Sequence, residues 1–346
     1  MDARQQTTHK GRDFRGCKVL VTGADGFIGS HLVEALHASG AHITALAMYN
    51  SFDTFGWLDD LPKEVLSDIC RVRGDVRDGA FMRRIVDGQE VVFHLAALIA
   101  IPHSYAAPQS YVETNILGTL NVLEAARDCG VSRVVHTSTS EVYGSALTLP
   151  ISEQHPLQGQ SPYSASKIGA DMMAESFVRS FALSVVILRP FNTYGPRQSE
   201  RAIIPTLIRQ FLDPACQFLK VGDVTTLRDF TFAADTAAAF MTVGAGGLVE
   251  FGRPYNAGSG KMIAVSDLIE VLADITGMSK QVINEQERMR PANSEVRALQ
   301  ADSRRLFEDT GWRPRVSLKQ GLSRTVAWWR GRLTHGQARR DSTFMS

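Results

Sequence analysis

The chain has 346 residues, which is enough for one large domain or two closely packed ones. Its 37 basic and 36 acidic residues leave a formal net charge of +1, so no overall charge indicates a nucleic-acid or membrane partner. No apolar run reaches the length of a membrane span, and the polar N-terminus lacks the apolar segment of a secretory signal, which predicts a cytoplasmic protein.

Short β-branched runs alternate with amphipathic segments from Lys18 onward. Clear strand-like runs are 18–23, 41–48, 90–97, 132–140 and 184–192. Gly40 and Gly130 are placed to end helices in the left-handed conformation, and Asp78 is placed to cap the helix that follows it. The alternation predicts a doubly wound α/β fold, with a parallel sheet covered by helices on both faces.

Three glycines fall where the first predicted strand meets the first helix. Gly23, Gly26 and Gly29 in VTGADGFIGSHL have the spacing GxxGxxG. Glycines here allow a tight turn and bring a pyrophosphate close to the free N–H groups of the helix N-terminus. An ordinary loop can contain glycines too, but the strand-turn-helix context favours dinucleotide binding. The predicted cofactor contacts in this turn are Gly23, Asp25, Gly26, Phe27, Ile28 and Gly29.

The end of the second strand leaves the choice of cofactor open. ITALAMYNSFD has no Arg to favour NADP, and its first acid, which would favour NAD, comes only at Asp53. Asp75 and Val76 in GDVRD lie at a later strand end, where the carboxylate can accept a hydrogen bond from adenine or cap a helix. The remaining predicted cofactor contacts, after the run EVVFH, are Leu95, Ala96 and Ala97.

A tyrosine and a lysine share one face of a predicted helix. Tyr163 and Lys167 in QSPYSASKIGAD stand four residues apart and can act together. We expect the ammonium to draw the tyrosine pKa down from about 10, making Tyr163 a base for a substrate hydroxyl and both residues cofactor contacts. Thr139 in TSTSEVYG, at the end of the preceding strand, can bond the same hydroxyl.

Together, GxxGxxG, YSASK and TSTSEVYG resemble the extended short-chain dehydrogenases/reductases that act on nucleotide sugars, over roughly residues 17–330. The resemblance implies a Rossmann fold in which Tyr163, Lys167 and Thr139 oxidise sugar carbon 4 with a bound nicotinamide. It also implies that Asn115 supports the lysine through backbone and water contacts.

Glu141 is the candidate base for a second step. A ketone at carbon 4 makes the proton on carbon 5 acidic, so a nearby carboxylate can remove it while the hydroxyl on carbon 6 leaves as water. The order Thr139, Ser140, Glu141 resembles the Thr-Ser-Glu motif of GDP-mannose dehydratases. Because Ser140 replaces the Asp of other members, the proton for the leaving hydroxyl comes from Glu141 or from a water on Ser140. An isolated Glu at a strand end can also be a simple cap or ion-pair partner.

Longer phrases, such as PISEQHPLQGQSPYSASKIGAD, are similar to the configuration-retaining UDP-N-acetylglucosamine 4,6-dehydratases of legionaminic acid pathways. That subgroup is NAD-dependent, so we expect a lyase with NAD, with NADP not excluded. Tyr163 stands where configuration-inverting dehydratases use a lysine. UDP-glucuronate decarboxylases carry the same TSEVYG, and a related 5,6-dehydratase uses much the same residues. These two activities and 4-epimerisation stay open as alternatives.

The C-terminal half is expected to hold the nucleotide-diphosphate sugar. Asn192 matches a family position that contacts the diphosphate, and Arg228 and Arg290 match positions for the pyrophosphate and nucleotide. Guanidinium groups bind phosphates bidentately. A single Arg would be better explained as surface charge, but two in matching contexts favour phosphate binding. Glu295 is expected at the ribose hydroxyls, and His103 is a further predicted substrate contact.

We predict a dinucleotide-binding domain at 16–190 and a smaller substrate lobe mainly at 191–330, which can be interleaved with it. The polar ends, 1–15 and 331–346, have no apolar period and are expected to be flexible.

The family resemblance further implies a homodimer, formed by the helices around residues 108–129 and 162–182. No metal site is expected, because the four cysteines form no CxxC pair and the nine histidines show no HxxxH or HExxH spacing.

Overall fold

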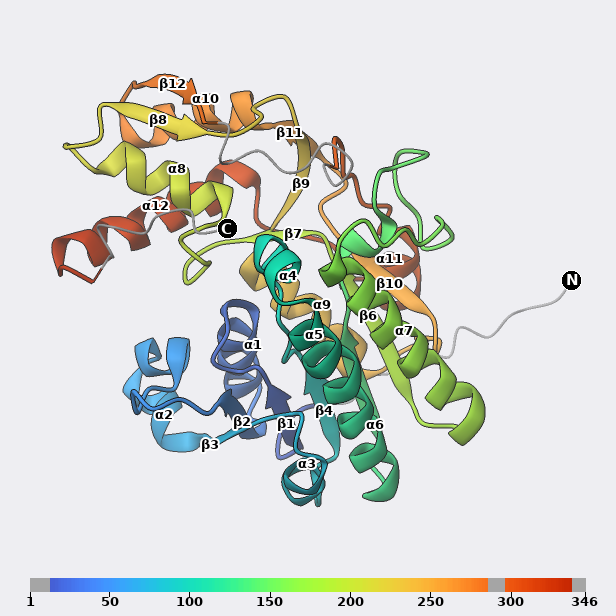
Figure 1. Cartoon of the computed structure of the whole chain (residues 1–346). Helices are drawn as coiled ribbons and strands as arrows, with labels where there is room; N and C mark the ends of the chain where they lie inside the picture. The colour runs from blue at the N-terminus through green and yellow to red at the C-terminus, as the bar shows by residue number, and fades with distance from the viewer. Residues whose placement is uncertain (1–12, 286–295, 338–346) are drawn as a thin grey trace, which may run out of the picture.

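The computed structural model describes residues 13–285 and 296–337 (Figure 1). A seven-stranded sheet has the order β10-β6-β5-β4-β1-β2-β3, and every neighbouring pair in it is parallel. Its strands are β1 (Lys18–Thr22), β2 (His42–Met48), β3 (Cys70–Gly74), β4 (Val91–His94), β5 (Arg133–Thr137), β6 (Val185–Pro190) and β10 (Pro254–Ala257). The predicted doubly wound α/β fold is confirmed.

Helices cover both faces of this sheet (Figure 1). One face carries α1 (Phe27–Ala38) and α9 (Ala233–Ala245), which pack on each other. The other face carries α3 (Gly79–Val86), α6 (Gly118–Asp128) and α7 (Pro162–Phe181). Shorter elements beside them are η1 (Gly56–Asp60), α2 (Lys63–Asp68), α4 (Ile101–Ala106), α5 (Pro108–Tyr111), the π-helix η2 (Val112–Leu117), η3 (Ser140–Tyr143) and α11 (Arg304–Thr310).

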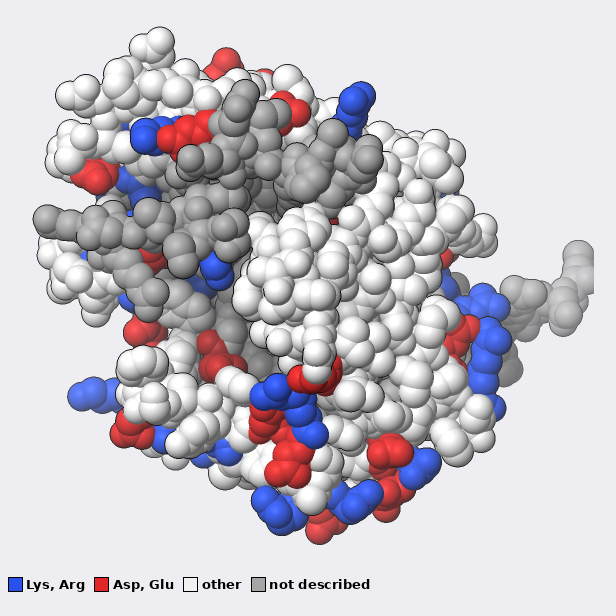
Figure 2. Space-filling view, viewed as in Figure 1, with Lys and Arg blue, Asp and Glu red and all other residues white. Residues whose placement is uncertain are grey.

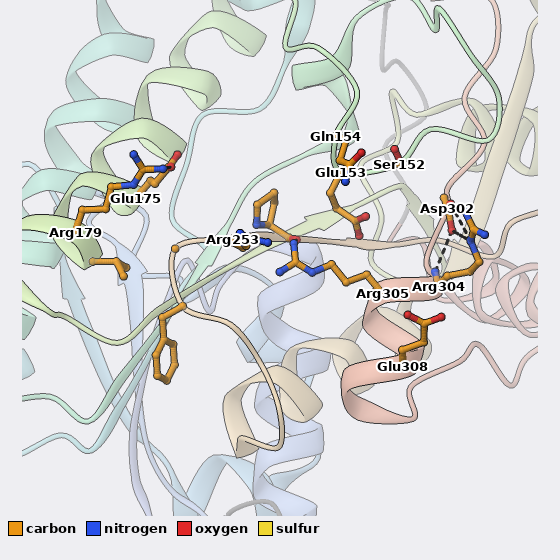
Figure 3. Close-up of a pocket in the computed structure, with 14 residues that line it drawn as sticks. Ser152, Glu153, Gln154, Glu175, Arg179, Arg253, Asp302, Arg304, Arg305 and Glu308 are labelled. Atoms are coloured by element: carbon orange, nitrogen blue, oxygen red, sulfur yellow. Dashed lines mark hydrogen bonds and ion pairs between the residues drawn. The ribbon is translucent and has the colours of Figure 1, made fainter. Parts of the chain in front are cut away.

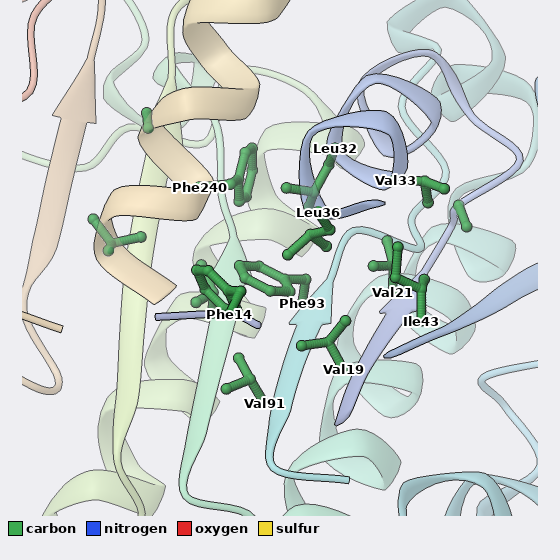
Figure 4. Packing of buried hydrophobic residues seen from close by; sticks show 14 of the residues in the cluster. Phe14, Val19, Val21, Leu32, Val33, Leu36, Ile43, Val91, Phe93 and Phe240 are labelled. Atoms are coloured by element: carbon green, nitrogen blue, oxygen red, sulfur yellow. The ribbon is translucent and has the colours of Figure 1, made fainter. Parts of the chain in front are cut away.

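Alternation along the central strands builds a core on each side of the sheet. Val21 of β1 and Phe93 of β4 face α1 and α9, where they join Leu36 and Phe240 in one buried cluster (Figure 4). Leu20, next to Val21, faces the opposite cluster beneath α3, α6 and α7. A parallel sheet buried on both faces explains why these strands read as nearly continuous apolar runs.

A second lobe is built from residues beyond β6. It contains a three-stranded sheet, β11-β9-β7, and a two-stranded sheet, β12-β8. These strands are β7 (Asn192–Tyr194), β8 (Phe218–Val221), β9 (Leu227–Phe232), β11 (Met262–Ala264) and β12 (Gln281–Asn284). The helices α8 (Ile203–Leu212), α10 (Val265–Thr276) and α12 (Leu318–Thr334) enclose its core. Because β10 joins the large sheet and α9 covers one of its faces, the two parts of the chain interleave.

The predicted caps are confirmed. Asp78 is the N-cap of α3 and accepts a hydrogen bond from the Phe81 backbone at 2.9 Å. Gly40 and Gly130 follow α1 and α6 with φ of 79° and 68°. The cap at α3 is therefore Asp78, and Asp75 does not have that role.

Both predicted flexible ends are too long. Phe14 is buried, with its ring 5.9 Å from that of Phe93. At the other end α12 continues to Thr334, because the Arg332 guanidinium lies over the rings of Trp57 and Trp328 and pairs with an acid of η1. Within the described ranges, no helix is both long enough and apolar enough to cross a membrane.

Candidate active site

The turn between β1 and α1 is packed backbone against backbone. Gly23 has a φ of 65°, and a Cβ there would lie 2.7 Å from the Ala96 nitrogen. A Cβ on Gly29 would collide with the Gly23 carbonyl oxygen. Gly26 is the N-cap of α1, and no described side chain caps the helix. The turn therefore leaves the N-terminus of α1 open to an anion, which fits a dinucleotide pyrophosphate.

Two side chains hold the strands around this turn. The Thr22 hydroxyl accepts hydrogen bonds from the backbone of Leu95 and Ala96, both at 3.1 Å, which fixes the predicted contact segment after β4. The Asp25 carboxylate accepts a hydrogen bond from the Met48 backbone at 3.1 Å, and burial raises its pKa. Asp25 therefore links the glycine turn to the end of β2.

The predicted adenine end is fixed by local contacts. The Asp75 carboxylate pairs with the Arg77 guanidinium, with Nη2 to Oδ2 at 2.5 Å, and this hydrogen bond lowers the Asp75 pKa. Val76 is buried, and its carbonyl accepts a hydrogen bond from the Asn121 amide at 2.9 Å. Asp75 as an adenine acceptor stays a prediction.

No arginine lies at the end of β2 in the sequence, but the neighbouring strand of the sheet brings one there. Arg73 of β3 pairs in register with Ala47 of β2. Its guanidinium lies 3.9 Å from the Phe55 ring centroid and pairs with Asp53 at 2.7 Å. Sequence reading along β2 missed it because the residue belongs to the neighbouring strand.

The predicted catalytic residues lie together at the carboxyl end of β5. Thr139 is the N-cap of η3, where its hydroxyl accepts a hydrogen bond from the Glu141 backbone at 3.2 Å and shares another with the Tyr163 hydroxyl. Lys167, one turn along α7 from Tyr163, donates to the Thr137 carbonyl at 2.5 Å. Tyr163 and Lys167 are buried, whereas Glu141 is partly exposed.

The expected lowering of the Tyr163 pKa is wrong for this structure. Burial raises the pKa of Tyr163 well above its usual value; the Thr139 hydrogen bond opposes this rise and the charge of Glu141 adds to it. Lys167 directs its ammonium at the Thr137 carbonyl, and burial lowers its pKa to about 8, although Asp171 acts in the opposite direction. Desolvation is therefore the main cause of both pKa shifts.

Asn115 lies in the π-helix η2, a rare distortion that is frequent at functional sites. Its side chain bonds both backbone groups of Leu98, at 2.8 and 2.9 Å, and donates to the Ser166 hydroxyl at 2.9 Å. Asn115 therefore contacts α7 at Ser166, the residue before Lys167. Its support of Lys167 through backbone and water contacts, which the family resemblance implies, stays a prediction.

Buried polar residues that the motifs did not reveal connect these parts. His94 bonds Thr22 at 2.9 Å and Thr119 at 3.0 Å, and Thr119 donates to the Asn115 carbonyl at 2.6 Å. Because Thr22 already accepts two backbone hydrogen bonds, its own proton goes to His94 Nδ1, and the ring donates through Nε2. Burial lowers the His94 pKa, which agrees with a neutral ring. A polar residue within the apolar run EVVFHLAA was the available signal.

The predicted substrate residues are only partly brought to this site. The His103 ring of α4 lies 6.0 Å from that of Tyr111, which in turn lies 6.3 Å from that of Tyr163. Asn192 begins β7, and its amide nitrogen is buried without a hydrogen-bond partner among the described residues. Arg228 lies on β9 and donates to the Leu227 carbonyl at 3.1 Å. Arg290 and Glu295 lie outside the described residues.

A cavity of about 700 Å³ lies elsewhere, against the outer edge of β10 between α7 and α11 (Figure 3). It contains none of the predicted site residues. At the strand edge, Glu153 accepts a hydrogen bond from the Asn256 backbone at 2.9 Å, and Arg305 donates to the Pro254 carbonyl at 3.2 Å. These side chains satisfy the backbone groups of an edge strand, so the cavity is not the candidate reaction site.

The sequence model of the GDP-mannose 4,6 dehydratase family matches residues 20–325. The chain belongs to this family. It is thus an extended short-chain dehydrogenase/reductase of the NAD-dependent epimerase/dehydratase group, as the sequence motifs predicted.

Relatives of this family member include two kinds of enzyme. This chain is 32% identical over 320 residues to a dTDP-glucose 4,6-dehydratase of Actinoplanes sp., and the match covers 90% of this chain and 98% of the relative. It is 33% identical over 322 residues to a UDP-glucose 4-epimerase of Mycolicibacterium smegmatis, covering 91% and 99%. Family membership therefore leaves dehydration and epimerisation to be distinguished.

A solved structure shows the same architecture with a cofactor. The dTDP-glucose 4,6-dehydratase of Streptomyces venezuelae, crystallised with NAD, is 32% identical and superposes with a TM-score of 0.79. The match covers 92% of this chain and 98% of that one.

The burial of its ammonium predicts that Lys167 lowers the stability of the folded protein. Its pKa of about 8 lies below the usual 10.5, so from pH 8 to 10.5 the unfolded chain binds more protons and wild-type stability rises with pH. We expect Lys167→Met to raise the free energy of unfolding at pH 7 by about 1–3 kcal/mol, with most of this gain gone at pH 10.

Urea unfolding of both proteins at the two pH values measures the effect. An equal gain in the free energy of unfolding at both pH values would show that removal of a buried charge does not cause the stabilisation. Lys319→Met, an exposed lysine of α12, is the matched control and should give no gain.

Proposed function

We propose that the protein is a nucleotide-sugar 4,6-dehydratase that uses NAD and converts UDP-N-acetylglucosamine to UDP-4-keto-6-deoxy-N-acetylglucosamine. The observation that carries the proposal is the position of Glu141. Its carboxylate lies close enough to influence the Tyr163 pKa, and its backbone bonds the Thr139 hydroxyl. A partly exposed carboxylate beside the Thr139–Tyr163 pair is what removal of the carbon 5 proton requires.

The cofactor proposal is supported by the glycine turn. Its backbone leaves no space for a side chain at Gly23 or Gly29, and the N-terminus of α1 carries no described side-chain cap. NAD, when bound, supplies the acceptor for the hydrogen and electron pair removed from sugar carbon 4 and gives them back at carbon 6. The protein contributes Thr22, which holds the segment after β4 against this turn.

The side chains divide the proton transfers between them. Tyr163 accepts the proton of the carbon 4 hydroxyl as a phenolate, a form that burial disfavours and the Thr139 hydrogen bond favours. Glu141 removes the proton on carbon 5, and the hydroxyl on carbon 6 leaves with a proton as water. Ser140 is buried, whereas Glu141 is partly exposed, which favours Glu141 over a water on Ser140 as the donor of that proton. Lys167 holds the carboxyl end of β5 through the Thr137 carbonyl.

Substrate contacts are proposed for Asn192, Arg228 and His103. The Asn192 amide is the best supported, because a buried donor without a partner is costly until a ligand oxygen satisfies it. Arg290 and Glu295 remain sequence-based candidates.

Epimerisation is the second candidate, because the Mycolicibacterium smegmatis relative is an epimerase. Decarboxylation of UDP-glucuronate and 5,6-dehydration use the same kind of residues and are distinguished by product.

We further propose a homodimer that forms through the helices of residues 108–129 and 162–182, which are α5, η2, α6 and α7. Figure 2 shows a broad face over α4, α5 and α7 that is almost free of Lys, Arg, Asp and Glu. Val112, Leu117 and Met172 expose 47%, 47% and 44% of their surface, although each is apolar. An apolar area of this kind is typical of protein–protein contacts.

Product analysis tests the proposed reaction. UDP-N-acetylglucosamine, incubated with the protein in deuterated water with a hydrazide present, should lose one water, take up deuterium and give a trapped ketone by mass spectrometry. Water loss without a trapped ketone would indicate the 5,6-alkene. An unchanged substrate after NAD addition would reject the proposal, and UDP-glucuronate and UDP-glucose would then test decarboxylation and epimerisation.

Replacement of Glu141 separates the two chemical steps. Glu141→Gln should still oxidise carbon 4, seen as reduced-cofactor absorbance, but should slow water loss by about 100-fold or more, because the base is gone. Glu64→Gln, at an exposed position of α2, is the control. Product formation at the wild-type rate would reject Glu141 as the base.

A charge on the uncharged face tests the dimer. Met172→Glu should lower the mass measured by light scattering from two chains to one, since burying an unpaired carboxylate opposes association. Leu248→Glu, at a 63% exposed position after α9, should leave the mass unchanged. A wild-type protein with the mass of one chain would contradict the proposed assembly.

A further inference from the structure

A buried ion pair lies directly beneath the candidate catalytic residues. Asp171 follows Lys167 by one turn of α7 and is 0% exposed, and Arg189 of β6 is 3% exposed. The guanidinium bonds one oxygen of the carboxylate through Nη2 at 2.9 Å and Nε at 3.1 Å. His136 of β5 bonds the other oxygen at 3.1 Å. A buried pair is tolerated when further hydrogen bonds satisfy both charges, as here.

The pair also holds the two ends of the segment that carries Thr139 and Glu141. At one end the Ser138 hydroxyl donates to the Asp171 carboxylate at 2.8 Å. At the other end the Tyr143 hydroxyl accepts from Arg189 Nη1 at 2.9 Å and donates to the Asn256 side chain at 2.7 Å. Ser138 directly precedes Thr139, and Tyr143 is the last residue of η3.

We propose that Asp171 and Arg189 are positioning residues, which act through Ser138 and Tyr143 to hold the 139–141 segment against Tyr163. The assignment of chemistry to that segment rests on the proposed function, whereas the anchoring does not.

The short η3 helix makes this anchoring necessary. It contains four residues, and hydrogen bonds in a 3-10 helix have poorer geometry than those in an α-helix, so its own bonds do not fix its orientation. The two hydroxyls tie it to β6 and α7, which are rigid elements of the large sheet and its covering layer. A reacting group misplaced by about 1 Å can lose about 100-fold in rate.

Single hydroxyl deletions test the proposal with little risk to folding. Ser138→Ala frees one end of the segment and Tyr143→Phe frees the other. Tyr255→Phe is the matched control: Tyr255 is equally buried, lies on β10 of the same sheet, and its hydroxyl accepts one hydrogen bond, from Glu250, and donates one, to Asp309. Tyr143→Phe and Tyr255→Phe thus each delete a hydroxyl that makes two hydrogen bonds, but only the first of these hydroxyls anchors the 139–141 segment.

Two measurements are made on each variant. Deuterium exchange of peptides covering residues 137–144 should be faster in Ser138→Ala and Tyr143→Phe than in wild type and unchanged in Tyr255→Phe. In turnover of UDP-N-acetylglucosamine, kcat should fall by about 10- to 100-fold in the first two variants, while KM changes less than about twofold, because the substrate lobe is untouched.

Wild-type exchange and kcat in both Ser138→Ala and Tyr143→Phe would overturn the proposal. So would an equal loss in Tyr255→Phe, which would indicate a general effect of deleting a buried hydroxyl. If the wild-type protein does not turn over UDP-N-acetylglucosamine, the proposed function fails separately, and the exchange measurement alone still decides whether the segment is anchored as proposed.

Discussion

All seven strands of the large sheet run parallel, so their carboxyl ends meet at one edge, and the candidate site depends on this constraint. The glycine turn follows β1, the Leu95–Ala97 segment follows β4, and Thr139 follows β5. The strand order reverses between β1 and β4, and such a switch point leaves a crevice in which open α/β sheets bind ligands. The parallel sheet therefore brings together residues that are far apart in the chain, and contacts such as those of Thr22 with Leu95 and Ala96 hold them there.

The candidate site also depends on hydrogen bonds made by polar side chains buried at this edge. His94 is satisfied by Thr22 and Thr119, and Asp171 by His136, Ser138 and Arg189. A buried polar group without a partner costs stability, so each of these contacts restricts the backbone around it. The same bonds that make the burial tolerable thus hold the glycine turn and the candidate catalytic segment in place.

Sequence reasoning succeeded where one local rule decided the outcome. The alternating apolar runs, the Asp78 cap and the left-handed Gly40 each follow from neighbouring residues only. It failed where two distant groups compete. The Tyr163 pKa depends mainly on burial, and burial cannot be read from a spacing of four residues. The last turn of α12 looked like a polar tail because one partner of Arg332, Asp60, lies 272 residues earlier in the chain.

The sequence by itself determined the fold class, the glycine turn and the membership of Thr139, Glu141, Tyr163 and Lys167 in one group, because periodicity and motif spacing are local properties. Only the tertiary structure decided what surrounds that group. The buried Asp171–Arg189 pair, the Arg73 guanidinium beside β2 and the direction of the Lys167 ammonium arise from neighbouring strands and helices. Their partners are set by packing, which no linear pattern records.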